Sequence, residues 1–249
     1  MHPVLFKIGM LEIYSYGVAL VAAFLVGTFL AMKEAPKQNI DPENILDLSI
    51  LIGIAAVIGS RIACVIINWS YYSQNPISIV SRGGGLSFHG GLTAGFLIGL
   101  WYVRRHKIPV GITADLAAPY VALGYAITRI GCLLNGCCFG RVSDVPWALR
   151  ASFLDNALRH PTQLYASIIN LLFFGILLYL RDKKPFNGYV FVVYVGLYGV
   201  YRFFIEYFRE SDIYIGPLTL GQVVSLVMVL AAAALIKFWP WGRVKEAHE

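Results

Sequence analysis

The feature that most constrains this chain is a series of apolar runs long enough to cross a lipid bilayer. A membrane-spanning helix needs about 20 mostly apolar residues. Hydrophobic residues make up 58% of the 249 residues and charged residues only 14%, a balance that fits neither a water-soluble fold nor a disordered chain. We therefore expect an all-α integral membrane protein, with residues 1–249 forming a single polytopic domain. Its seven predicted transmembrane helices cover about 12–32, 44–69, 86–103, 113–134, 162–180, 188–207 and 217–239.

Lysine and arginine are distributed unevenly between the loops. The loops on one side and the C-terminal tail carry 11 of the 20 Lys and Arg residues, and the loops on the other side carry 6. Positively charged loops stay in the cytoplasm, so we expect the N-terminus outside and the C-terminus in the cytoplasm. The net charge of +6 is then explained by topology and anionic lipid, and we expect no nucleic-acid partner. The outer loop at 139–161 is a candidate for a short interfacial helix.

Costly polar residues gather near the predicted outer ends of the spans. Ionisable groups inside a span are expensive and are functional candidates by default. Interfacial tyrosines and snorkelling side chains offer an alternative explanation, but they account poorly for three span arginines. The pattern predicts a site toward the outer leaflet, and its members include Tyr16, Arg61, His89, Arg129, Asn135, His160, Gln163, Arg202, Glu206 and Gln222.

One helical face in the sixth run carries several of these groups. Tyr198, Arg202, Glu206 and Arg209 are spaced by 4, 4 and 3 residues, which places them on one side of a helix. In one interpretation Arg202 and Glu206 are only an ion pair that lowers the cost of insertion. In the other, arginine binds a phosphate through its planar fork, while Glu206 orients it or moves a proton.

A glycine-rich run from Arg82 to Leu92 surrounds His89 with five glycines. Glycine permits close approach of a ligand or of another helix. His89 is therefore either a general base, a role that suits histidine near neutral pH, or a packing residue at a close helix crossing.

Three cysteines, Cys132, Cys137 and Cys138, follow Arg129 closely. Their spacing matches neither a CxxC pair nor a zinc-finger pattern. Small packing residues, a disulfide on the outer side, and a catalytic or metal-binding role all remain open, and packing is the first expectation. We expect no metal site and no cofactor.

Taken in order, several motifs resemble the bacterial prolipoprotein diacylglyceryl transferase family. The resemblance covers most of the chain, and the order of the motifs is more specific than any one of them. They are Tyr16-Gly17, Gly59-Ser60-Arg61, Gly84 to Gly91, Arg129-Ile130-Gly131, Asn135-Gly136, Gly140-Arg141, His160 to Tyr165, Tyr198 to Arg209 and Leu220-Gly221-Gln222.

The resemblance implies transfer of the diacylglyceryl group of phosphatidylglycerol to the lipobox cysteine of a prolipoprotein signal peptide. It implies a multi-pass enzyme of the bacterial cytoplasmic (inner) membrane, with its active site toward the outer leaflet. The implied catalytic residues are His89, Arg129, Arg202 and Glu206. The implied substrate-binding residues are Arg129, Tyr16, Arg61, Asn135, Gly140, Tyr198 and Arg209.

The chain departs from the family's usual pattern at three positions. Cys132 stands where an asparagine is usual, and Cys137 and Ala166 stand where glutamates are usual. These departures keep an alternative open, a diverged lipid-handling paralogue with a changed substrate. A membrane transporter and a thiol redox protein are further alternatives. The transporter is disfavoured because no internal repeat and few inner-side polar groups are found.

Overall fold

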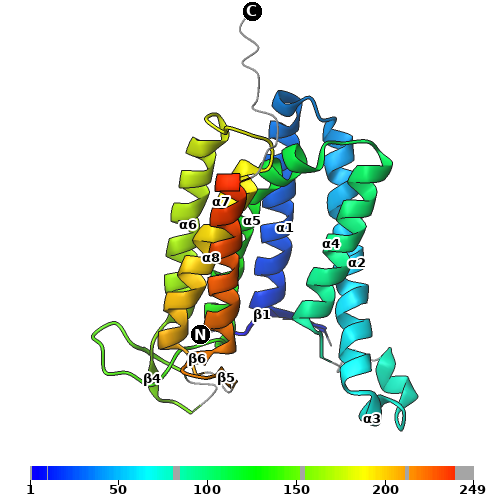
Figure 1. The fold of residues 1–249 in the computed structure, drawn as a ribbon. Helices are drawn as coiled ribbons and strands as arrows, with labels where there is room; N and C mark the ends of the chain where they lie inside the picture. The colour runs from blue at the N-terminus through cyan, green and yellow to red at the C-terminus, as the bar shows by residue number, and fades with distance from the viewer. Residues whose placement is uncertain (1, 10, 81–84, 152–154, 211–212, 239–249) are drawn as a thin grey trace, which may run out of the picture. The chain divides into compact units, whose positions relative to one another are not determined.

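The computed structural model describes residues 2–9, 11–80, 85–151, 155–210 and 213–238. These residues contain seven helices of 17 residues or more (Figure 1): α1 (Ser15–Glu34), α2 (Pro42–Ile67), α4 (Phe88–Arg105), α5 (Val110–Asn135), α6 (Thr162–Arg181), α7 (Tyr189–Ile205) and α8 (Leu220–Phe238). The short helices are η1 (Ala35–Gln38), α3 (Trp69–Tyr72), η2 (Pro76–Ile79) and η3 (Glu206–Phe208). The strands are β1 (Val4–Ile8), β2 (Leu11–Tyr14), β3 (Leu149–Arg150), β4 (Leu158–Arg159), β5 (Tyr214–Ile215) and β6 (Leu218–Thr219).

The structure is mostly helical, as expected of an all-α membrane protein. Each of the seven predicted runs overlaps one long helix. Within the described residues, six helices are long and apolar enough to cross a membrane. In this count η1 continues the α1 span, and η3 continues the α7 span. The seventh, α4, is not among them, because it contains several glycines, His89 and the pair Arg104-Arg105.

The chain divides into two compact units. Unit 1 comprises residues 1–31 and 114–249, and unit 2 comprises residues 32–113. Unit 1 contains most of α1, nearly all of α5, and α6 to α8, whereas unit 2 contains α2 and α4.

Small residues bring the helices of unit 1 close together. A Cβ added at Gly131 of α5 would collide with the Cβ of Ala19 in α1. A Cβ at Gly199 of α7 would lie 3.0 Å from the Ser225 carbonyl oxygen in α8. Close approach of this kind is typical of helix pairs in membranes, where van der Waals packing replaces the hydrophobic effect between helices.

A buried carboxylate organises the start of α7. Asp115 of α5 is 1% exposed, and it accepts hydrogen bonds from the backbone N–H groups of Gly188 (2.8 Å) and Phe191 (3.1 Å). Lys184 lies 3.5 Å from the same carboxylate. The first N–H groups of a helix have no partner within it, so Asp115 both caps α7 and finds compensation for its own burial.

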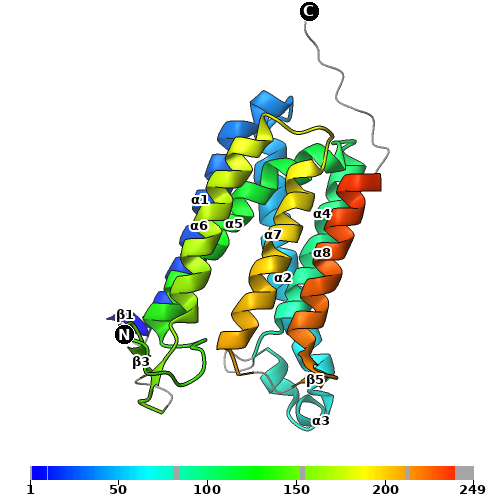
Figure 2. The ribbon, with the colours of Figure 1, turned by 60° about the vertical axis from the view of Figure 1, so that its left-hand side comes forward.

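Three short antiparallel hairpins, β1–β2, β3–β4 and β5–β6, lie at one end of the unit 1 helices (Figures 1 and 2). We call this the hairpin end; α5 and α7 finish there and α6 and α8 begin there. The predicted interfacial helix at 139–161 is wrong for the described part of that loop, residues 139–151 and 155–161. That part contains the β3–β4 hairpin. Buried Arg159 stabilises it through contacts with other residues of the loop, as described below.

Unit 2 is built on a close crossing of α2 and α4. A Cβ added at Gly59 would lie 2.8 Å from the Gly90 carbonyl oxygen, and one at Gly90 would lie 2.5 Å from the Gly59 carbonyl oxygen. Toward the other end of the pair, the Tyr102 hydroxyl donates a 3.2 Å hydrogen bond to Asn44. Gly90, the residue after His89, therefore serves helix packing, which was one of the two interpretations of that run.

Candidate functional site

Arg129 of α5 lies beside an aromatic cluster near the hairpin end of unit 1. Its Nη2 donates a 2.6 Å hydrogen bond to the Tyr125 hydroxyl, and its guanidinium carbon lies 4.6 Å from the centre of the Tyr125 ring. Tyr125 in turn meets Tyr198 of α7 edge to face, with ring centroids 5.8 Å apart. The cluster fixes the guanidinium on an aromatic face, and Nη2 is its one donor with a hydrogen-bond partner among the described residues.

Arg202 and Glu206 form the expected ion pair one helical turn apart. Arg202 Nη1 lies 2.8 Å from Glu206 Oε2, and the Glu206 side chain is only 4% exposed. Gly221 of α8 makes room for this carboxylate, since a Cβ there would lie 2.8 Å from Glu206 Oε1. The predicted Arg202–Glu206 ion pair is therefore confirmed, and a role of the pair toward a ligand stays a prediction.

The Gly140-Arg141 segment lies between the backbone at His160 and the backbone at Phe208. Gly140 N–H donates to the His160 carbonyl (2.9 Å), and Arg141 N–H donates to the Phe208 carbonyl (2.8 Å). A Cβ at Gly140 would collide with the Phe208 carbonyl oxygen and lie 2.9 Å from the His160 Cβ. Only glycine fits here, so the place of Gly140 in the pattern is explained by close backbone approach.

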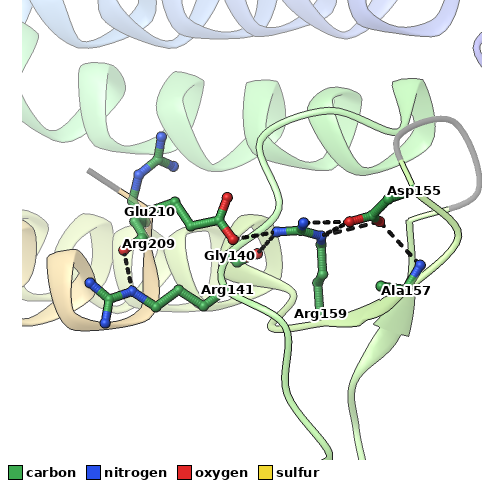
Figure 3. A network of polar contacts seen from close by, with 7 residues as sticks. All are labelled: Gly140, Arg141, Asp155, Ala157, Arg159, Arg209 and Glu210. Atoms are coloured by element: carbon green, nitrogen blue, oxygen red, sulfur yellow. Dashed lines mark hydrogen bonds and ion pairs between the residues drawn. The ribbon is translucent and has the colours of Figure 1, made fainter. Parts of the chain in front are cut away.

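Buried Arg159 gathers the surrounding loops into one network (Figure 3). Its Nη1 donates to the Gly140 carbonyl (3.0 Å) and to Glu210 (2.9 Å). Its Nη2 lies 2.5 Å from Asp155, whose other oxygen accepts the Ala157 N–H at 3.1 Å. The Arg159 hydrogen bonds lower the pKa of the Asp155 carboxyl.

Arg209 enters the same region through its backbone. Its carbonyl accepts a 2.7 Å hydrogen bond from Arg141 Nε, and its side chain extends away from that contact (Figure 3). The Arg209 guanidinium acts electrostatically on Cys138, as does Arg129. Arg209 thus comes within electrostatic reach of Cys138, although 71 positions separate the two in the sequence.

The end of α5 explains how the cysteines meet. Gly136 has a φ of +75°, and it donates to the Leu133 carbonyl while Cys137 N–H donates to the Cys132 carbonyl, both at 3.1 Å. This is a Schellman turn, which glycine favours after a helix, and Asn135 is the last helical residue before it. The turn folds Cys137 back over Cys132, so that the three sulfurs of Cys132, Cys137 and Cys138 lie within 4.8 Å of one another.

Two buried side chains of α6 hold this turn in place. Thr162 Oγ1 donates to the Cys138 carbonyl at 2.8 Å, and Gln163 Nε2 donates to the Cys137 carbonyl at 2.6 Å. Both residues are 3% exposed or less. The Cys138 thiol donates to the Cys137 sulfur at 3.7 Å, and the Cys137 thiol donates to the Cys132 carbonyl at 3.6 Å.

Tyr16 also belongs to this neighbourhood. A Cβ at Gly131 would lie 3.5 Å from the Tyr16 Cα, so the start of α1 packs against α5 between Arg129 and Cys132. Unit 1 thus gathers eight of the ten predicted site residues toward its hairpin end: Tyr16, Arg129, Asn135, Gly140, Tyr198, Arg202, Glu206 and Arg209.

The other two predicted site residues, Arg61 and His89, lie in unit 2. Arg61 donates from Nε to the Ile79 carbonyl (2.8 Å), from Nη1 to the Gly85 carbonyl (3.0 Å) and from Nη2 to the Ser78 carbonyl. His89 is exposed in the first turn of α4, with Phe88 edge-on at 5.7 Å. Residues 82–84 of the glycine-rich run lie outside the described residues.

Sequence reasoning missed Tyr125 as the partner of Arg129, and it missed Arg159 with its partners Asp155 and Glu210. Tyr125 was detectable, since it precedes Arg129 by four residues on the same helical face. Glu210 carried no such signal, because its contact with Arg159 joins positions 51 residues apart.

Comparison with known proteins identifies the relatives of this chain. Residues 3–238 match the family model described as prolipoprotein diacylglyceryl transferase. A phosphatidylglycerol–prolipoprotein diacylglyceryl transferase of Clostridioides difficile is 37% identical over 92% of both chains. Proteins with the same name from Finegoldia magna and from Wolbachia pipientis are 35% and 38% identical, over 94% and 92% of both chains. With its several apolar helices, the chain is a multi-pass membrane protein, and it belongs to the prolipoprotein diacylglyceryl transferase family.

Proposed function

We propose that this chain is a phosphatidylglycerol–prolipoprotein diacylglyceryl transferase, which transfers the diacylglyceryl group of phosphatidylglycerol to the lipobox cysteine of a prolipoprotein. The observation that carries the proposal is the likeness to transferases of that name over more than 90% of both chains. In the reaction the cysteine thiol loses its proton, and a C–S bond replaces the C–O bond between diacylglycerol and phosphate. Glycerol phosphate leaves with the electron pair of the broken bond.

The hairpin end of unit 1 supplies the groups that such a reaction needs for its phosphate. Arg129 sits on the Tyr125 ring, with donors left to bind a phosphodiester and to stabilise the charge that grows on the leaving phosphate. Arg202, held by Glu206 at 2.8 Å, and Arg209 add positive charge nearby. Tyr16, Asn135, Tyr198 and Gly140 complete the proposed substrate-binding set, Gly140 through close backbone packing.

His89 is proposed as the base that takes the thiol proton, because thiolate is the nucleophilic form. Its exposure in the first turn of α4 leaves its ring accessible. Substrate binding by Arg61 stays a prediction; its three carbonyl partners favour an anchoring role for Ser78, Ile79 and Gly85. The unpaired acceptor of Gln163, Oε1, is a further polar group at this end of unit 1 among the described residues.

Topology and location complete the proposal. We propose that α4 is the seventh span and that 1–249 works as one membrane domain. The N-terminus and the hairpin end face outward, and the reaction takes place at the outer leaflet of a bacterial inner membrane. The charge distribution of the loops supports this orientation, because the 181–184 loop is rich in Lys and Arg and lies opposite the hairpin end of unit 1 (Figure 2).

Complementation tests the activity. The chain is expressed in a bacterium depleted of its own transferase, and lipidation of precursor lipoproteins is measured by mass spectrometry. We expect the precursors to gain a diacylglyceryl thioether. If the chain inserts into the membrane and the precursors stay unmodified, the transferase proposal fails and the alternative of a diverged lipid-handling paralogue replaces it.

A further inference from the structure

Three thiols at the end of α5 form a cluster that the proposed transfer reaction does not use. Cys132 lies on the helix, and Cys137 and Cys138 follow the Schellman turn. The Cys137 and Cys138 sulfurs are 3.7 Å apart, and all three sulfurs lie within 4.8 Å of one another. Thiolates about 2.3 Å from a common tetrahedral ion would be separated by about 3.8 Å. The observed spacing is therefore close to that of a three-sulfur metal site.

The backbone around the cluster is fixed before any ligand arrives. The buried side chains of Thr162 and Gln163 donate to the carbonyls of Cys138 and Cys137. The Cys132 carbonyl accepts the Cys137 N–H at 3.1 Å, and the Cys137 thiol lies 3.6 Å from the same oxygen. Only the side-chain torsions of the cysteines need to adjust, so binding would cost little conformational entropy.

Access and charge both suit a cation. Cys132 is buried, Cys137 is half-buried and Cys138 is exposed, so an ion can enter from the Cys138 side and retain an open coordination position there. Three thiolates and one divalent ion carry a net charge of −1. Arg129 and Arg209, whose positive charges act on Cys138, offset that charge.

A disulfide between the closest sulfurs fits less well than a shared ion. The sulfurs of Cys137 and Cys138 are the closest pair for which a distance is defined. Their Cα atoms, as chain neighbours, are about 3.8 Å apart, whereas disulfides join Cα atoms about 4.4–6.8 Å apart. A bridge between neighbours would therefore strain the backbone, and it would leave the third thiol without a role.

We propose that Cys132, Cys137 and Cys138 bind one soft, thiophilic metal ion of the d10 class through three thiolates, with a fourth position open on the Cys138 side. Soft sulfur ligands select such ions over Mg²⁺ or Ca²⁺, which prefer oxygen. The proposal does not depend on the proposed transferase activity, because the geometry of the three sulfurs carries it.

The test uses the full chain, purified in detergent, reduced, and kept anaerobic. Cd²⁺ is the probe, because its bonds to thiolates give a charge-transfer band in the ultraviolet. We expect one Cd²⁺ per chain. Replacement of any one of the three cysteines by serine should weaken binding about tenfold or more, at least as much as loss of an outer-shell partner.

Cys64→Ser is the matched control, since Cys64 is a buried cysteine of α2 in unit 2 and should leave Cd²⁺ binding unchanged. Cys138→Ser is the variant least disturbing to the fold, because Cys138 is exposed; unchanged helicity by circular dichroism verifies this. Absence of a thiolate band in the wild type overturns the proposal, as does equal binding by the triple serine variant. A further outcome would favour a disulfide over the metal site. In that outcome, protein purified without reductant lacks two free thiols, and reduction does not restore Cd²⁺ binding.

Discussion

Arg129 in unit 1 and Arg61 in unit 2 are both arginines of apolar helices, yet their surroundings differ. All three guanidinium nitrogens of Arg61 donate to backbone carbonyls of residues 78–85. Both guanidiniums lie over a tyrosine ring, that of Tyr72 for Arg61 and that of Tyr125 for Arg129, but Arg129 donates to a side chain, the Tyr125 hydroxyl. An arginine whose three nitrogens all donate to carbonyls stabilises a loop, whereas one with donors to spare can bind an anion. A charged residue within a span is thus a functional candidate only until its partners are known.

The two units also differ in what stabilises them. Unit 2 relies on glycine contacts between α2 and α4, while the hairpin end of unit 1 relies on ion pairs that involve Arg159, Glu206 and their partners. Electrostatic contacts respond to pH and to loss of one partner, and packing contacts respond to added volume. Perturbations of the two kinds can therefore be compared between the units.

The largest effect is expected at Glu206. Glu206→Ala removes a carboxylate that is 4% exposed and leaves Arg202 without its 2.8 Å partner. Breaking a buried pair in this way costs about 3–5 kcal/mol, so thermal unfolding in detergent should occur at a much lower temperature. The double variant Glu206→Ala with Arg202→Met should recover part of the loss. An unfolding temperature for Glu206→Ala equal to that of the wild type would show that the pair does not stabilise unit 1.

Arg61→Lys should weaken unit 2 by an intermediate amount. A lysine has no planar fork and cannot reach three carbonyls at once, so one or two charged hydrogen bonds of about 1.5–3 kcal/mol each are lost. We expect faster hydrogen exchange in residues 76–80, measured by mass spectrometry. Unchanged exchange there would contradict the anchoring role and would return Arg61 to the substrate-binding set.

Gly90→Ala tests the packing of unit 2. Its Cβ would lie 2.5 Å from the Gly59 carbonyl oxygen and collide with Ala63, and forced overpacking costs about 1–3 kcal/mol. Gly175→Ala in α6 is the matched control, because its Cβ would meet nothing within 4 Å and alanine favours a helix. Equal unfolding temperatures for the two variants would exclude a tight α2–α4 crossing.

The smallest effect concerns Asp155 and acid. Arg159 lowers its folded-state pKa, so the contact adds stability above the unfolded value of about 3.9 and loses it as pH falls through the lower folded value. The Ala157 N–H donates a hydrogen bond to the Asp155 carboxylate. This amide should lose its protection from hydrogen exchange below about pH 4, after correction for intrinsic exchange rates. Asp155→Asn should remove this pH dependence, and persistence of the dependence in that variant would assign it to another carboxylate.

Much of this architecture could be predicted from the sequence, because membrane helices depend on local apolar length. The helix positions follow from the apolar runs. The Arg202–Glu206 pair follows from a spacing of four residues along one helix. The β3–β4 hairpin could not be predicted, since buried Arg159 takes its partners from Gly140 and Glu210, which are distant in the chain. The cysteine cluster was predictable in part: Asn135-Gly136 indicates a helix end, but the left-handed Cys138 (φ +65°) and the clamps from α6 are tertiary effects.

We propose above that the hairpin end of unit 1 binds the phosphate of phosphatidylglycerol through Arg129. The most direct measurement is the rate of diacylglyceryl transfer to a lipobox peptide per folded molecule of Arg129→Lys, which keeps the charge and loses the fork. Arg150→Lys, at a loop arginine that contacts the Asn156 carbonyl, controls for arginine loss in general. We predict that Arg129→Lys falls about tenfold or more, as loss of charged hydrogen bonds requires, while Arg150→Lys keeps the wild-type rate. A wild-type transfer rate in folded Arg129→Lys would contradict phosphate binding by Arg129.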